Sequence, residues 1–89
     1  MNFEWDEAKA RINQSKHGVS FSEATEVFAD EYSSFVNDPD HSYEEARYLL
    51  FGVSSKGRYL VVSFTERQET VRIISARRMT RQERKAYEQ

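Results

Sequence analysis

The alternation of apolar and polar positions is clearest between residues 58 and 78. Two runs rich in β-branched and aromatic residues, 59–65 and 70–76, flank a polar stretch and contain neither Pro nor Gly. This pattern predicts an antiparallel hairpin with residues 66–69 as its loop. If Thr65 pairs with Thr70, the even-numbered residues of the first run and the odd-numbered residues of the second share one apolar face. Arg72 then lies on the opposite face.

A third strand is predicted at residues 47–53, RYLLFGV, joined to the hairpin by a turn containing Gly. Pairing Val53 with Arg58 would place Leu49 and Phe51 on the apolar face that the hairpin register already defines. Two independent registers agreeing on one face is the consistency expected of a real sheet. We therefore expect these two side chains in the core.

Two weaker strands complete the sheet. Residues 3–5 form a short apolar-polar-apolar run that suits an edge strand, and residues 32–37 form a second candidate. The second candidate ends at Asp38-Pro39-Asp40, which is typical turn chemistry.

Residues 6–16 show helical periodicity, with Trp5, Ala8 and Ile12 on one stripe and Gly18 as a left-handed cap. A second helix begins at Ser20, which forms a capping-box pattern with Glu23. The residues expected to be buried on this second helix are Phe21, Ala24, Val27 and Phe28.

A third helix follows Thr80, where Thr80-x-x-Glu83 is a second capping-box pattern. Only Ala86 and Tyr87 could be buried, so this helix should pack loosely. The element order is β-α-α-β-β-β-β-α in a single domain, residues 1–89. The predicted fold class is α+β, a small antiparallel sheet with two N-terminal helices on one face and a C-terminal helix. The expected core is Trp5, Ile12, Phe21, Val27, Phe28, Leu49, Phe51, Leu60, Val62, Phe64, Val71 and Ile73.

Composition removes several classes of function. The chain has no Cys, which excludes disulfides and thiolate metal sites. It has no apolar run of membrane-spanning length and no signal-peptide pattern at its start, so we expect no membrane partner and a cytoplasmic location. Asp38, Asp40 and His41 could ligate a metal, but no second cluster completes a shell. We expect neither metal nor cofactor.

Charge is distributed unevenly along the chain. Residues 1–45 hold three Lys or Arg against eleven Asp or Glu, whereas residues 67–85 hold seven Lys or Arg against two Glu. The basic part can meet phosphate, and the acidic part can meet a basic protein.

The basic part carries the candidate chemistry. Arginine binds phosphate through a fixed fork of donors and never titrates near neutral pH. The arginines in question are Arg67, Arg72, Arg77, Arg78, Arg81 and Arg84. Their structural alternative is a solvated basic face with ion pairs to Glu69 and Glu83.

Three further residues are candidates for proton transfer. His17 can act as acid or base near neutral pH, with Lys16 beside it, and Glu66 precedes Arg67. The alternatives are a histidine that interacts with the end of its helix and an ordinary loop glutamate.

The chain resembles the BrnT toxins of bacterial type II toxin–antitoxin systems over nearly its whole length. The resemblance is carried by F-x-W-D, by N-x-x-K-H-G-V-S-F and by R-I-I-S-A-R with a following E-R-x-x-Y. It implies a RelE-like fold and a metal-independent endoribonuclease that cleaves RNA through the ribose 2′-OH and arrests translation. It also implies a BrnA-like ribbon-helix-helix antitoxin and binding of the complex to operator DNA.

On this resemblance, Arg67, Arg72 and Arg77 match motif arginines, and Lys16 with His17 match the K-H-G motif. Glu66 joins them as a candidate base, while Arg78, Arg81 and Arg84 are expected to bind RNA. The alternative function is a non-catalytic basic binding module in an operon-repressing complex. Apolar residues expected on the arginine face, Tyr48, Leu50, Tyr59, Val61 and Ile74, suggest that the antitoxin packs there.

Overall fold

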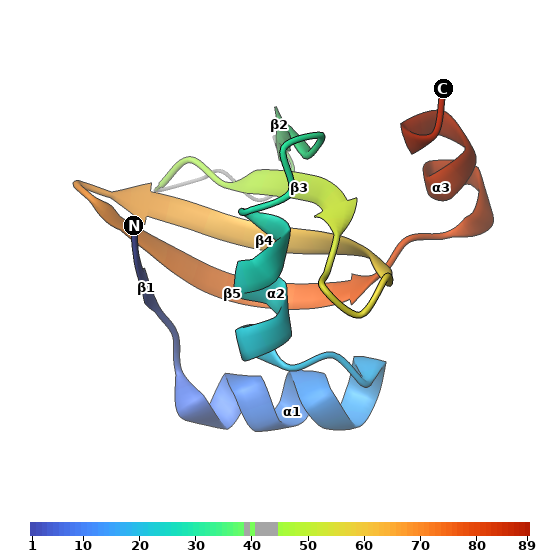
Figure 1. Cartoon of the computed structure of the whole chain (residues 1–89). Helices are drawn as coiled ribbons and strands as arrows, with labels where there is room; N and C mark the ends of the chain where they lie inside the picture. The colour runs from blue at the N-terminus through green and yellow to red at the C-terminus, as the bar shows by residue number, and fades with distance from the viewer. Residues whose placement is uncertain (39, 41–44) are drawn as a thin grey trace.

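The described part of the computed structural model, residues 1–38, 40 and 45–89, has the predicted order of elements (Figure 1). The elements are β1 (Asn2–Glu4), α1 (Glu7–His17), α2 (Phe21–Val27), β2 (Ser34–Asn37), β3 (Tyr48–Val53), β4 (Tyr59–Arg67), β5 (Thr70–Arg78) and α3 (Arg81–Tyr87). The strands form one sheet in the order β1-β5-β4-β3-β2. No helix in the described residues is long and apolar enough to span a membrane. The α+β fold class is confirmed.

The sheet is mixed, which differs from the antiparallel sheet predicted. The strands from β2 to β5 pair antiparallel, but β1 pairs parallel to β5, with Phe3 beside Val71. No hairpin joins β1 to its neighbour, because both N-terminal helices and three strands intervene. The direction of β1 is therefore not restricted to antiparallel. Its predicted position at the edge of the sheet is confirmed.

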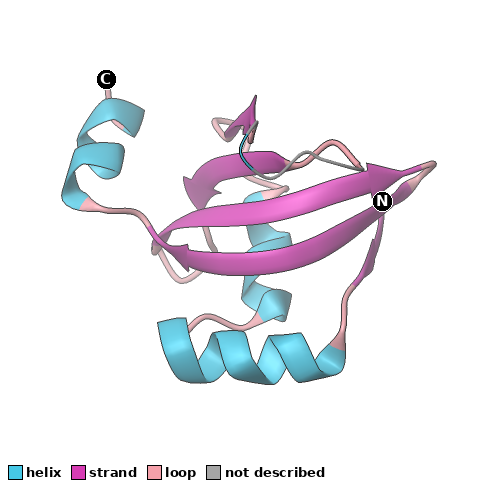
Figure 2. Cartoon of the chain, turned by 180° about the vertical axis from the view of Figure 1, so that it is seen from behind, coloured by secondary structure: helices cyan, strands magenta, loops and turns pink. Residues whose placement is uncertain are grey.

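Helices α1 and α2 cover one face of the sheet, which we call the core face (Figure 1). The Ser20 hydroxyl accepts from the Glu23 amide at 3.0 Å, as the capping pattern predicts. Phe21, Ala24 and Val27 are buried as expected. Viewed from behind, β4 and β5 stand in front of α2, and α1 lies along the β5 edge of the sheet (Figure 2). We call this second side the outer face.

The prediction for α1 is right in extent and wrong in orientation. Its start at Asp6 and its left-handed end at Gly18, φ 68°, are as expected. Ile12, however, is 64% exposed, and Asn13 is the buried residue of the helix. The reason is that α1 runs beside β5, where the Asn13 amide replaces missing strand partners.

The register between β3 and β4 differs from the prediction by one residue. Val53 pairs with Tyr59, so Leu50 faces the core and the predicted core residues Leu49 and Phe51 face outward. The cause is Arg58, which stays in the loop and binds the carboxylate of buried Glu23 on α2, with Nε to Oε2 at 2.9 Å. This ion pair extends the turn, and a one-residue shift exchanges the two faces of a strand.

The register between β4 and β5 also differs. Arg67 pairs with Thr70 across a two-residue loop, so the predicted four-residue loop is wrong, although the shift of two keeps the predicted faces. A β-bulge then interrupts the pairing, because Phe64 pairs with Ile73 while Ser63 pairs with Ser75. From Ser75 onward the faces of β5 are exchanged.

Most of the predicted core is confirmed. The buried apolar side chains are Val19, Phe21, Ala24, Val27, Leu50, Leu60, Val61, Val62, Phe64, Val71, Ile73 and Ala76. Trp5 and Phe28 are partly buried against them. Gly52 is required where β3 passes α2, because a Cβ there would lie 2.7 Å from Val27 Cγ1.

Helix α3 is anchored more firmly than predicted. Its capping box is present, with Thr80 and Glu83 bonded reciprocally. The Tyr87 hydroxyl donates to Asp30 Oδ2 at 2.9 Å, and its ring meets Tyr59 edge to face at 6.0 Å. Burial and this hydrogen bond raise the pKa of Tyr87 to about 12. Contacts between a few polar and aromatic side chains therefore fix α3 at one end of the sheet.

Candidate functional site

Three of the predicted arginines lie on the outer face. Arg67 pairs with Thr70, Arg72 with Thr65 and Arg77 with Val61, and the bulge turns Arg77 to the same side as Arg72. Without the extra residue in β5, Arg77 would lie on the core face, because side chains alternate along a strand. The bulge therefore assembles the arginine face.

Each of these arginines binds a different carboxylate. Arg67 donates to Glu45 at 2.5 and 3.1 Å, and Arg72 donates to Glu4 at 2.8 Å. Arg77 forms a bidentate pair with Glu83 on α3, at 2.7 and 2.9 Å.

The Arg77 hydrogen bonds are the main cause that lowers the pKa of Glu83 to about 2. The arginine that Glu83 holds therefore stays beside a charged carboxylate at neutral pH. The corresponding bond from Arg67 lowers the pKa of Glu45.

The three arginines do not meet at one point. Arg77 pairs with Val61, which is six residues from Arg67 along β4, or roughly 20 Å. Arg72 pairs with Thr65, which is four residues from Val61, or roughly 13 Å. One phosphate cannot contact all three guanidinium groups. Arg67, Arg72 and Arg77 instead form a line of positive charge, the arginine track, which could bind several phosphates of an extended RNA chain.

A groove between α1 and β5 brings Lys16 and His17 beside this track, at β5 residues that lie between Arg72 and Arg77. It has a volume of about 200 Å³ and is lined by Lys9, Ile12, Asn13, Lys16, His17, Ile74 and Ser75. No carboxylate is among these residues. Ser75 and Arg77 are two residues apart on the outer face, so their Cα atoms are about 7 Å apart. Arg72 is as far from Ser75 along the β4 register, so Lys16 and His17 line a groove beside the stretch of β5 between the two arginines.

Asn13 fixes the two walls of this groove. Its amide nitrogen donates to the carbonyls of Val19 and Ala76, at 2.9 and 2.8 Å, and its oxygen accepts from the Ala76 amide at 3.1 Å. Strand β1 pairs only with residues 70–72 of β5, so Asn13 satisfies the edge that β1 leaves open. Ala76 directly precedes Arg77, so the hydrogen bonds from Asn13 connect α1 to the strand segment that carries Arg77.

Glu66 does not lie with the arginines. It alternates with Arg67 along β4, pairs with Val71 on the core-face side, and lines a groove at the hairpin end together with Glu69. We predicted that the Glu66 carboxylate lies beside Arg67. It does not, because neighbouring residues of a strand point to opposite faces of the sheet.

The remaining predicted arginines are outside the track. Arg78 is exposed at the end of β5 and pairs with Leu60 on the core-face side. Arg81 is exposed on α3, and Arg84 lies over the Tyr59 ring at 4.0 Å. Contact of Arg81 and Arg84 with RNA would have to occur at the α3 end of the sheet.

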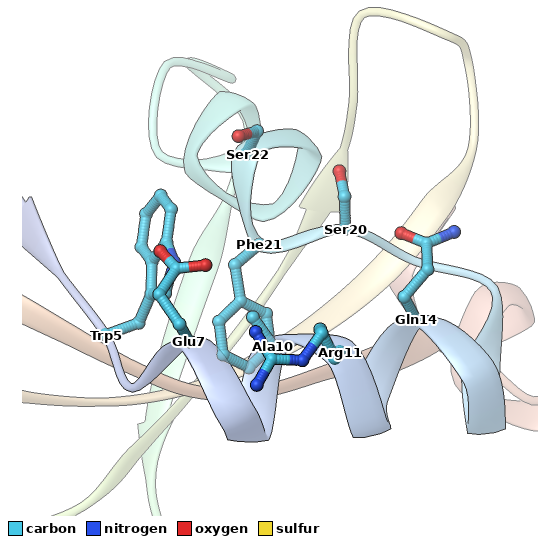
Figure 3. Close-up of a pocket in the computed structure, with 8 residues that line it drawn as sticks. All are labelled: Trp5, Glu7, Ala10, Arg11, Gln14, Ser20, Phe21 and Ser22. Carbon is cyan, nitrogen blue, oxygen red and sulfur yellow. The ribbon is translucent and has the colours of Figure 1, made fainter.

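A second groove of about 360 Å³ lies between α1 and α2 (Figure 3). Trp5 and Phe21 form its apolar part, and Arg11 lies at its rim. The carboxylate of Glu7 is taken up by the Trp5 indole, which donates to it at 3.0 Å. The groove has no histidine, so it offers no group that titrates near neutral pH and is a weaker candidate.

The metal-ligand expectation concerned Asp38, Asp40 and His41. His41 lies outside the described residues, and within those residues no three His, Cys, Asp or Glu side chains form a metal-binding group.

Sequence reasoning missed Asn13 and Ser75. A stripe through Ala10, Asn13 and His17 has the same helical spacing as the stripe that was chosen, and it contains the buried residue.

Comparisons with known proteins agree on one family. The model of the family described as "Ribonuclease toxin, BrnT, of type II toxin-antitoxin system" matches residues 5–83. A crystal structure of the Brucella abortus ribonuclease toxin BrnT is similar, with a TM-score of 0.71 and 21% identity, over 91% of this chain and 99% of that chain. No curated protein matches. The family model covers most of the sequence, and the chain therefore belongs to the BrnT family of ribonuclease toxins.

Proposed function

We propose that this chain is a metal-independent endoribonuclease whose active site is the groove between α1 and β5. One observation carries the proposal: Lys16, His17 and Ser75 line one groove, and Arg77 follows on the same face of β5. These supply an imidazole, an ammonium, a hydroxyl and a guanidinium. Cleavage of a phosphodiester by a neighbouring hydroxyl needs a proton acceptor, a proton donor and cationic stabilisation.

The reaction is attack of a ribose 2′-OH on the adjacent phosphorus. The His17 imidazole takes the 2′-OH proton as the new O–P bond forms, and Arg77 stabilises the charge on the pentacoordinate phosphorus. The bond from phosphorus to the 5′ oxygen then breaks, and the Lys16 ammonium gives a proton to that oxygen. The products are a cyclic 2′,3′-phosphate and a strand with a free 5′-OH. Guanidinium and ammonium supply all the positive charge, so the mechanism includes no metal.

The arginine track binds the rest of the substrate. Along β4, Arg72 lies two positions from Ser75 on the side opposite to Arg77, and Arg67 lies four positions away, so they contact phosphates beside the one that is cleaved. Each must exchange its present carboxylate, Glu4 or Glu45, for a phosphate oxygen. Cleavage of cellular RNA in this way stops translation. A ribbon-helix-helix antitoxin neutralises the toxin, and the complex represses its operon by binding operator DNA.

A non-catalytic binding module is the second candidate. The three arginine–carboxylate pairs favour it, because each of these guanidinium groups already binds a carboxylate of the same chain. A binding module would hold RNA with these arginines and leave it intact, and it would not depend on His17.

The test is cleavage of a defined RNA by the purified chain, in buffer containing EDTA. We expect cleavage by the native chain and a loss of roughly a hundred- to thousandfold in rate for Arg77→Ala, since it removes a donor to the transition state. His17→Gln should also lose activity, because it removes the proposed proton acceptor.

The matched control is Arg11→Ala, which removes an exposed cation from the other side of α1 and should cleave normally. Unfolding of each variant by urea separates loss of chemistry from loss of fold. A folded Arg77→Ala variant that cleaves at the native rate would refute the assignment. RNA binding without cleavage by the native chain would establish the binding module instead.

A further inference from the structure

The outer edge of β2 is an unprotected strand edge. Among the residues that the structure describes, strand β2 is the last of the sheet and pairs only with β3 (Figure 1). All four of its residues are exposed, and Phe35 and Val36 are exposed by 64% and 48%. Tyr32, just before the strand, is 77% exposed. These are the largest exposed apolar groups among the described residues apart from Met1 and Ile12.

The backbone of this edge can accept a further strand. The Asp38 amide donates to the Arg47 carbonyl at 2.8 Å, and Asn37 pairs with Tyr48 in the adjacent position. Since antiparallel pairs alternate in hydrogen bonding, Phe35 and Asn37 direct their N–H and C=O groups away from β3.

The side chains of the edge are apolar on both faces. Phe35 pairs with Leu50 and meets the Tyr48 ring edge to face at 5.7 Å, whereas Val36 lies on the other face beside Leu49. Natural proteins protect such edges with Lys, Pro or bulges, and β2 itself, Ser34–Asn37, contains none of these, although Pro39 follows it closely in the sequence. An unprotected apolar edge of this kind is a template for another chain.

Charge at the two ends of β2 selects the partner. Glu31 precedes the strand, Asp40 follows it, and both are exposed. A second copy pairing antiparallel about Phe35 and Val36 would bring the acidic residues that flank β2 in one copy toward those that flank it in the other. Repulsion between these like charges opposes that pairing. An extended segment with Lys or Arg at its ends meets the same carboxylates favourably.

We propose that an extended, basic segment of the antitoxin binds the free edge of β2 as an additional antiparallel or parallel strand. The identity of the partner rests on the proposed function. The surface differs from the one that the sequence suggests, because Leu50 and Val61 are buried, at 5% and 2% exposure, and cannot receive a partner. The docking site is therefore separate from the arginine track.

The first test uses the purified antitoxin encoded with this chain and two substitutions at one position. Asn37→Pro removes an outward N–H while leaving the β2–β3 hydrogen bonds in place, and edge strands tolerate Pro on this side. We expect its dissociation constant to rise by roughly tenfold or more. Asn37→Ser keeps the donor and should stay within about twofold of native.

A second pair of variants tests charge. Both Phe35→Lys and Phe35→Glu remove the apolar ring of Phe35. Phe35→Lys places a positive charge against the basic segment, whereas Phe35→Glu places a negative charge there. We expect Phe35→Lys to bind more weakly than Phe35→Glu, with the difference shrinking at high salt.

Amide hydrogen exchange provides a readout that does not depend on any variant. In the complex, the Phe35 and Asn37 amides should become protected, whereas Val36, already bonded to β3, should change less. If both outward amides exchange in a saturated complex as fast as in the free chain, no strand is added and the proposal is wrong. Protection of both in the free chain at high concentration would identify a second copy as the occupant and also overturn it.

RNA cleavage by the same variants separates this proposal from the proposed function. Each variant should cleave RNA at the native rate without antitoxin. If the native chain does not cleave RNA but its β2 amides are protected by the antitoxin, the ribonuclease mechanism fails and the docking site stands. If it cleaves RNA and a folded Asn37→Pro variant binds antitoxin as the native chain does, the docking site fails alone.

Discussion

Replacing Asn13 by Ala should destabilise the fold and disturb the proposed active site together. The side chain is 5% exposed and makes hydrogen bonds to Ala76 N, Ala76 O and Val19 O, two residues that are fully buried. Water cannot easily replace the lost partners. At about 1 kcal/mol for each of the three hydrogen bonds, the free energy of unfolding should fall by about 3 kcal/mol. In a domain of this size, that corresponds to a fall of at least roughly 12 °C in Tm.

The measurement is urea unfolding at neutral pH, with exposed Gln14→Ala as the control on the same helix. Asn13→Asp keeps the acceptor for Ala76 N but directs a carboxylate at two carbonyl oxygens, so it should be at least as unstable as Asn13→Ala. A fall below about 1 kcal/mol for Asn13→Ala would mean that water or a shifted strand replaces the amide, contrary to this reasoning. At temperatures where the variant is still folded, kcat should fall by a larger factor than the affinity for RNA. The arginine track that binds RNA remains, whereas the groove between α1 and β5 loses its shape.

Two further predictions concern pH and register. The folded-state pKa of Glu83, about 2, is below its ordinary 4.5, so its contribution to stability is complete above pH 4.5 and lost as pH falls toward 2. Glu83→Gln should therefore flatten the acid limb of stability against pH, and an unchanged limb would show that the ion pair contributes nothing. Leu50→Asp should prevent folding, whereas Leu49→Asp, on the outer face, should fold. The reverse result in thermal unfolding would support the register predicted from sequence.

Local sequence determines much of this protein by itself. Residues 20–28 carry their own cap and apolar stripe, so Phe21, Ala24 and Val27 could be identified as buried from spacing alone. The same holds for Leu60 and Val62, which the two-residue period of a strand places on one face together with Phe64. Caps and side-chain periodicity depend on residues a few positions apart, and the sequence contains that information directly.

Tertiary structure alone decided the features that form the site. The Arg58–Glu23 ion pair joins residues 35 positions apart, extends the β3–β4 turn and moves Leu49 out of the core. The bulge in β5 turns Arg77 onto the face of Arg72, and no local pattern in an unbroken strand sequence marks where the extra residue falls.

The orientation of α1 has the same origin. Asn13 is buried and Ile12 is exposed because the backbone of Ala76 needs hydrogen-bond partners beyond the end of β1, 63 positions away in sequence. Satisfying a buried backbone edge outweighs the gain from burying one isoleucine. The sequence by itself determines the elements and their apolar faces, whereas only the assembled sheet brings Lys16 and His17 into one groove with Ser75 of β5.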